Sequence, residues 1–264
     1  LTEVDPFVFV SLRFALASLV LLPSVWFLFH KTTRAMLFGS LMIGILNAAA
    51  YLCQTIGLET VHSARAAFIT GASVIFVPFL APLFKLEKPS RLDKLCALIG
   101  FAGLYVIMDI QHFHIAHGDL WVFLGAISFS LQITYLQRLN QIIADYQLLT
   151  FYQLFFTLPF VLLFTRGHSF SEAMQPRALE GIIFCAVFAT SLAYYLQNKY
   201  QKFTNAPKAA LIFALEPVFA SVFGMLINRE LLARTTVYGG LLLLLSLVLP
   251  SLVNMSKESS SSIK

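Results

Sequence analysis

The sequence predicts an all-α integral membrane protein, and three observations lead to this fold class. Of its 264 residues, 58% are hydrophobic and only 12% are charged, whereas soluble domains carry about 25% charged residues. The mean hydropathy of +0.80 is typical of proteins that cross a membrane several times. Finally, apolar segments near the spanning length of about 20 residues follow one another with short polar connections. The lipid bilayer is therefore the expected surrounding of the chain.

Nine apolar spans are expected. They cover residues 6–29, 36–58, 66–84, 92–108, 120–137, 146–165, 181–198, 209–231 and 235–255. The fourth has a short uncharged centre and depends on the long side chain of Lys94 to reach the interface. A short polar tail, 256–264, follows the last span and is expected on the cytoplasmic side.

Lysine and arginine predict which ends of the spans face the cytoplasm, because cytoplasmic loops carry an excess of both. With the chain's start outside, the inner connections hold twelve of the 18 cations and the outer ones five, Arg13 being the last. The inner set is Lys31, Arg34, Lys85, Lys88, Arg91, Lys94, Arg138, Lys199, Lys202, Lys208, Lys257 and Lys264; the outer set is Arg65, Arg166, Arg177, Arg229 and Arg234. We expect a multi-pass protein of a bacterial inner (plasma) membrane.

An internal repeat relates the two halves of the chain. A shift of 143 residues (194 minus 51) aligns Tyr51 with Tyr194, Gln54 with Gln197, Phe76 with Phe219, Glu87 with Glu230 and Arg91 with Arg234. The span 120–137 has no partner in the first half, so we expect one further span to precede Leu1 in the intact protein. An odd number of spans per repeat places the two copies in opposite orientations. The predicted divisions are 1–109 for the first repeat, 110–118 for an outer connector and 119–255 for the second repeat.

The segment 209–231 carries one carboxylate, Glu216, near its middle, and Pro217 follows directly. Proline has no N–H to donate, so the carbonyl of Phe213, four residues earlier, loses its helical partner. A carboxylate beside broken backbone is costly in hydrocarbon unless it faces a cavity or a solute path. Glu216 is therefore a candidate site residue and a candidate proton carrier. The alternative is a structural pairing with a neighbouring helix.

Two polar stripes mark the second and the seventh span. They consist of Asn47, Tyr51 and Gln54 and of their repeat mates Thr190, Tyr194 and Gln197, each set at the spacing i, i+4 and i+7 of one helix face. Two symmetry-related polar stripes would line a central cavity between inverted repeats. The alternative role is hydrogen bonding between helices, which membrane proteins also use.

Three further polar residues complete the candidate solute site. Arg13 is the one cation inside a span. It is expected to pair with Glu216, to meet an anionic group of a solute, or to extend toward the outer interface. Thr70 and Ser73, one turn apart in the third span, are the repeat counterparts of the region around Glu216.

No cofactor, metal or nucleic acid is an expected partner. The connector with Asp109, His112, His114, His117 and Asp119 offers metal-ligand side chains, but nothing in it fixes a tetrahedral geometry, so a solvated connector is the preferred interpretation. Glu87 and Glu230 sit beside basic residues at helix ends, which favours topology or capping roles. The net charge of +5 is not gathered into an arginine-rich run or a basic helix face, as nucleic-acid binding would need.

The run AALIFALEPVFASVFGMLINREL, residues 209–231, resembles the signature of EamA-type members of the drug/metabolite transporter superfamily. Arg229-Glu230 stands where that family carries a Gly-Glu-like pair, and SLRFALASLVLLP holds the family-like arginine, Arg13. The resemblance covers almost the whole chain. It implies ten helices in inverted five-helix repeats with the first helix missing here, and a solute path between the repeats, without implying a substrate.

The function predicted from these features is secondary transport of a small organic solute, a metabolite or drug-like molecule, by alternating access. Protons are a candidate coupling ion, and a homodimer is a candidate assembly. A membrane-embedded enzyme is one alternative, although the chain lacks HExxH and GxSxG motifs. A non-transporting structural or sensory membrane protein is the other, and a scaffold has no need for repeat-related polar residues at mid-span.

Overall fold

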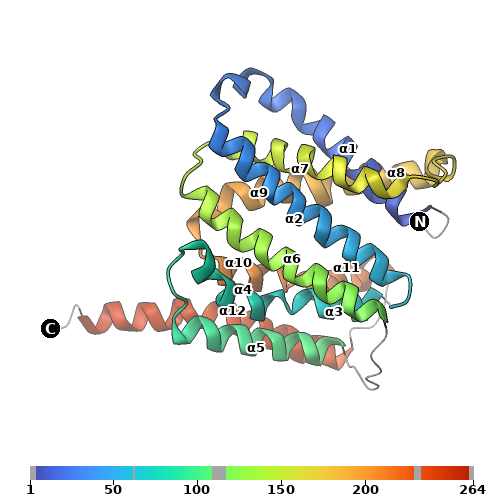
Figure 1. Ribbon diagram of the computed structural model, residues 1–264. Coiled ribbons are helices and arrows are strands. Elements are labelled where there is room, and N and C mark those ends of the chain that lie inside the picture. Colours follow the sequence, from blue (N-terminus) through green and yellow to red (C-terminus); the bar gives the residue numbers. More distant parts are fainter. Residues whose placement is uncertain (1–3, 62, 109–116, 229–232, 262–264) are drawn as a thin grey trace. The chain divides into compact units, whose positions relative to one another are not determined.

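The computed structural model describes all residues except 1–3, 62, 109–116, 229–232 and 262–264 (Figure 1). Its described elements are helices, and no strand occurs among them. The chain divides into two compact units, each built from two separate stretches. Unit 1 comprises residues 1–56 and 135–204, and unit 2 comprises 57–134 and 205–264. Each unit therefore contains helices from both predicted repeats, and the division into repeats stays a prediction.

Unit 1 is built on the packing of α1 against α7 and α8, which lie side by side in Figure 1. Its elements are α1 (Pro6–Val25), η1 (Trp26–Lys31), α2 (Arg34–Leu58, within the unit to Ile56), the end of α6 (His117–Asn140), α7 (Tyr146–Leu162), η3 (Leu163–Thr165), η4 (Glu172–Met174), α8 (Pro176–Ala186), the π-helix η5 (Val187–Leu192), α9 (Ala193–Tyr200) and η6 (Gln201–Phe203). A buried apolar cluster that includes Phe14 and Leu154 joins these helices.

Two aspartates at equivalent positions of the repeats start α1 and α7. Asp5 and Asp145 each accept hydrogen bonds from first-turn N–H groups through Oδ1, which satisfies donors that a helix start leaves unpaired. The second oxygen of Asp5 lies 2.7 Å from His168 Nδ1, and that of Asp145 lies 3.8 Å from Lys31 Nζ. His168 follows η3 at the end of α7, and Lys31 ends η1 after α1. The antiparallel pair α1–α7 is thus tied at both ends by related carboxylates.

Unit 2 contains the remaining helices. They are α3 (Ser63–Gly71), α4 (Ser73–Leu80), η2 (Ala81–Phe84), α5 (Arg91–Met108), most of α6, α10 (Ala206–Phe213), α11 (Glu216–Asn228) and α12 (Arg234–Ser261). A capping box starts α5: Ser90 N–H donates to Asp93 Oδ2, and Asp93 N–H donates to Ser90 Oγ. Arg65 and Asp119, at the starts of α3 and α6, form an ion pair of 2.6 Å.

The helices α5 and α12 run beside one another and approach closely through reciprocal glycines (Figure 1). A Cβ added to Gly103 would lie 2.7 Å from the carbonyl oxygen of Gly239. A Cβ added to Gly239 would collide with the carbonyl oxygen of Gly103. Small residues at such crossings let helix backbones touch, which is how many membrane helices associate.

Seven helical stretches in the described part of the chain are long and apolar enough to cross a membrane. The predicted fourth and ninth spans are helical as well, but they are not among the seven. The helix α5 begins with Arg91, Asp93 and Lys94, and the apolar part of α12, 234–250, is shorter than the others. The all-helical, multi-pass fold class is confirmed, while the number of nine spans stays a prediction.

We expect Gly239→Ala to lower the thermal unfolding midpoint, because its methyl group would meet backbone of α5 that cannot move aside. Overpacking of this kind costs about 1–3 kcal/mol. Gly240→Ala is the matched control, since its Cβ would find Val218 at an ordinary distance of 3.4 Å. Equal midpoints for the two purified variants would contradict the close glycine contact.

Candidate functional site

The two predicted polar stripes meet inside unit 1 through their tyrosines. The hydroxyl of Tyr194 donates to Oδ1 of Asn47 at 3.2 Å and lies 3.4 Å from the hydroxyl of Tyr51. Asn47 is fully buried and Tyr194 is 7% exposed. The Asn47 amide nitrogen has no partner among the described residues. The repeat mates Tyr51 and Tyr194 therefore form a buried polar contact that still offers a donor.

Arg13 extends this contact from the neighbouring helix α1. Its guanidinium carbon lies 5.3 Å from the centre of the Tyr51 ring, a cation–π arrangement. Its Nη2 donates to the carbonyl of Ala189 at 2.9 Å, and its Nε donates to the hydroxyl of Thr190. Arg13 is half-buried, and at 1.5 Å per residue it lies about 10 Å into α1. Four of the predicted site residues of unit 1 thus surround or adjoin this guanidinium.

A π-helix, Val187–Leu192, creates the backbone that Arg13 binds. The hydroxyls of Thr190 and Ser191 each donate to a carbonyl five residues earlier, Cys185 and Ala186. The N–H of Ala193 bonds to the carbonyls of Phe188 and Thr190, and Arg13 donates to Ala189 between them. We expected a regular helix over 181–198, and this part of the interpretation is wrong. Wide turns of this type recur at functional sites.

The outer members of the stripes lie apart from this cluster. Gln54 is half-buried on α2, and Gln197 donates through Nε2 to Oε1 of Gln201 at 3.1 Å, one turn further along the chain. The widened turn after Thr190 changes the register of the seventh span, so the spacing i, i+4 and i+7 does not place all three residues on one face. The structure therefore brings together the inner members of both stripes.

A second buried network in unit 1 was not expected. The amide nitrogen of Asn198 donates to Thr150 Oγ1 at 2.8 Å and to Gln153 Oε1 at 3.0 Å, and all three residues are fully buried. Nε2 of Gln153 and Oδ1 of Asn198 have no partner among the described residues. The repeat alignment contained a signal for this network, because a shift of 140 residues (145 minus 5) places Arg13 on Gln153.

Unit 2 contains a pair of helix breaks at equivalent positions of the repeats. The N–H of Ala72 donates to the carbonyl of Ile69 at 3.1 Å, and that of Leu215 donates to Ile212 at the same distance. Ala72 and Leu215 are 143 residues apart, the repeat shift. The first break separates α3 from α4, and the second separates α10 from α11, with α4 packed on α10. Discontinuous helices in corresponding halves are typical of transporter binding sites.

The three predicted site residues of unit 2 lie at these breaks. Thr70 stands in the last turn of α3, and its hydroxyl is buried without a partner among the described residues. Ser73 begins α4 and is 7% exposed. Glu216 begins α11, where an acid is favoured by the helix dipole, and its side chain is exposed. Pro217 interrupts the helix as expected, whereas the break at Ala72 has no proline and was missed. The pairing of Arg13 with Glu216 would join the two units and stays a prediction.

The histidine connector falls mostly on 109–116, outside the described residues. His117 begins α6 and accepts a hydrogen bond from Trp121 Nε1 at 3.2 Å. In the described part of the chain, no three His, Cys, Asp or Glu side chains gather as a metal site. Glu87 is exposed in a loop, and Glu230 lies outside the described residues.

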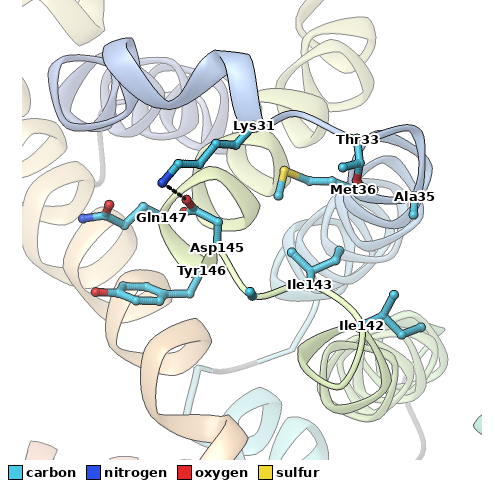
Figure 2. Close-up of a pocket in the computed structure, with 10 residues that line it drawn as sticks. Lys31, Thr33, Ala35, Met36, Ile142, Ile143, Asp145, Tyr146 and Gln147 are labelled. Carbon is cyan, nitrogen blue, oxygen red and sulfur yellow. Dashed lines mark hydrogen bonds and ion pairs between the residues drawn. The ribbon is translucent and has the colours of Figure 1, made fainter.

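Unit 1 also holds a cavity of about 470 Å³ at the ends of its helices. It is lined by Lys31, Thr33, Ala35, Met36, Ile142, Ile143, Ala144, Asp145, Tyr146 and Gln147. Figure 2 shows the Lys31 ammonium and the Asp145 carboxylate pointing toward one another across it. Its volume suits a small molecule, but its two charges face each other. Transport sites lie near mid-span, so the cluster around Arg13 and Tyr51 is the better candidate.

We expect Asn198→Ala to destabilise the protein, because it leaves Thr150 and Gln153 buried with fewer hydrogen bonds. An unsatisfied buried polar group costs about 1–3 kcal/mol. Gln175→Ala is the control: Gln175 is exposed and its side chain does not cap α8. A thermal midpoint for Asn198→Ala as high as that of the control would show that the network contributes no stability.

The fold and these sites define a class, the polytopic helical transporters with polar groups at mid-span and paired helix breaks. The model of the EamA-like transporter family matches residues 1–109 and 116–252. The chain belongs to this family, within the drug/metabolite transporter superfamily. This membership identifies an integral multi-pass membrane protein, a transporter rather than an enzyme, whose partners are a small-molecule solute and membrane lipid.

Relatives and solved structures agree with this assignment. An "uncharacterized transporter" of Archaeoglobus fulgidus is 28% identical over 256 residues, which cover 96% of this chain and 79% of the relative. A second protein with that name, from Haemophilus influenzae, is 32% identical over 77 residues, or 29% of this chain and 44% of the relative. A solved crystal structure has a TM-score of 0.80 at 14% identity, with 97% of this chain and 90% of that chain covered. The structural likeness shows the fold alone.

Proposed function

We propose that this protein is a secondary active transporter that moves a small organic solute across a bacterial inner membrane by alternating access. The observation that carries the proposal is the contact of Tyr51 with Tyr194, two repeat mates whose hydroxyls lie 3.4 Å apart beside Arg13. Residues related by an inverted repeat and joined at mid-span are where such transporters bind solute.

The chemistry of this site supports a polar solute. The Asn47 amide offers an unused donor, the two hydroxyls donate or accept, and Arg13 adds a positive charge. The aromatic rings of Tyr51 and Phe14, with centroids 5.0 Å apart, give the site an apolar wall. Few placed polar groups on an apolar lining are typical of small-molecule sites.

The helix breaks of unit 2 supply the second part of the proposal. Breaks at Ala72 and Leu215 expose backbone groups that a continuous helix would pair, and they place Thr70, Ser73 and Glu216 beside them. We propose that these residues contribute to the solute path and that Glu216 carries the coupling proton, because an intramembrane carboxylate is functional by default. Assembly as a homodimer stays a prediction.

Tyr51→Phe and Tyr194→Phe should each raise the half-saturating solute concentration in proteoliposomes about 2- to 12-fold, the value of one net hydrogen bond. The matched control is the pair Tyr146→Phe and Tyr195→Phe, whose hydroxyls also lie 3.4 Å apart but at the starts and ends of helices. Uptake that responds equally to both pairs would contradict the assignment of the site.

Glu216→Gln should abolish accumulation driven by an imposed proton gradient while preserving exchange of solute across the membrane, because glutamine cannot release a proton. Glu180→Gln, which changes an exposed carboxylate of α8, is the control. If Glu216→Gln still accumulates solute against its gradient, another group carries the coupling ion or the carrier is not proton-coupled.

A further inference from the structure

The charge of Arg13 has neutral partners only within its unit. Its described contacts are the Ala189 carbonyl, the Thr190 hydroxyl and the Tyr51 ring. Among the described residues of unit 1, the ion pairs join Asp5 with His168 and Asp145 with Lys31. A guanidinium inside a span is expensive unless a counter-ion or water reaches it. The neutral partners hold Arg13 in place but leave its charge to be balanced by another group.

The groups around Arg13 are mainly donors. Two of its five N–H groups are used in the described hydrogen bonds. The amide nitrogen of the fully buried Asn47 is a further donor without a partner among the described residues. Its oxygen is already occupied by the Tyr194 hydroxyl. A cluster with spare donors and a positive charge is complementary to an acceptor that carries negative charge.

Access to Arg13 is also available. The side chain is half-buried, and its bond to Ala189 lies at an exposed position. The guanidinium plane is anchored through Nε and Nη2, which leaves Nη1 and the second hydrogen of Nη2 to pair with a ligand. A planar fork of this kind binds a carboxylate through two parallel hydrogen bonds.

We infer that the transported solute carries a carboxylate, which binds the Arg13 guanidinium and the donor of Asn47. This assignment rests on the proposed transport function and adds the chemical class of the solute. Solutes that lack a negative charge would leave Arg13 uncompensated during transport and are poor substrates. The polar remainder of the solute lies against Tyr51 and Tyr194.

The test compares acids with their uncharged amides on the purified full chain and in proteoliposomes. The probes are pairs of amino acids, 2-hydroxy acids and short dicarboxylates with the corresponding amides, together with phosphate monoesters. We expect at least one acid to raise the thermal midpoint and to drive counterflow, while its amide does neither. Binding to the native state alone raises the midpoint, so this readout does not depend on transport.

Variants connect the response to Arg13. Arg13→Gln should weaken binding of the acid about 10- to 100-fold, the value of a charge-assisted hydrogen bond, and Arg13→Lys should retain part of it. Asn47→Asp should also weaken it, since it replaces the spare donor by a second negative charge. Arg138→Gln is the control, because that arginine bonds to Gln141 at the exposed end of α6. All comparisons use folded, monodisperse protein.

Three results would overturn the inference. Amides or phosphate esters that bind and move as well as the acids would reject the carboxylate and leave the transport function standing. Stability lost in Arg13→Gln and regained in the double variant with Glu216→Gln would show that Arg13 has an internal counter-ion. A folded parent protein that moves no member of the panel would count against the proposed transport function, and the substrate class would fall with it.

Discussion

A positive charge within a membrane span must be satisfied by the protein or by what it carries, because hydrocarbon provides neither counter-ion nor hydrogen bond. Arg13 imposes this constraint on unit 1. The π-helix of the seventh span turns a carbonyl and a hydroxyl toward it, and the Tyr51 ring covers one side. The local cost of widening a helix is thereby coupled to the placement of a charge at mid-span, which is where a solute carrier needs it.

The repeat appears in the structure as equivalent local solutions rather than as two separate bodies. Asp5 and Asp145 start related helices by the same capping contact. The chain breaks at Ala72 and Leu215 with the same backbone hydrogen bond. Each compact unit combines helices from both halves of the chain. Such sharing places related residues in one unit, as the contact between Tyr51 and Tyr194 illustrates.

The sequence was sufficient for the fold class and for part of the candidate site. Apolar length predicts spans directly, and the repeat shift singled out Tyr51 and Tyr194 before their contact was seen. The π-helix could not be predicted, because it depends on the hydroxyls of Thr190 and Ser191 bonding five residues back. The break at Ala72 contains no proline and also left no sequence signal. Such features arise from tertiary packing, which single-sequence periodicity does not report.

The most direct test of this account is an experimental structure of the protein in lipid nanodiscs with a transported solute bound. The account predicts density for the solute at mid-span, with an acidic group against the Arg13 guanidinium and the rest beside the Tyr51 and Tyr194 hydroxyls. Solute density in the cavity beside Lys31 and Asp145, with the Arg13 cluster unchanged from the solute-free state, would contradict it.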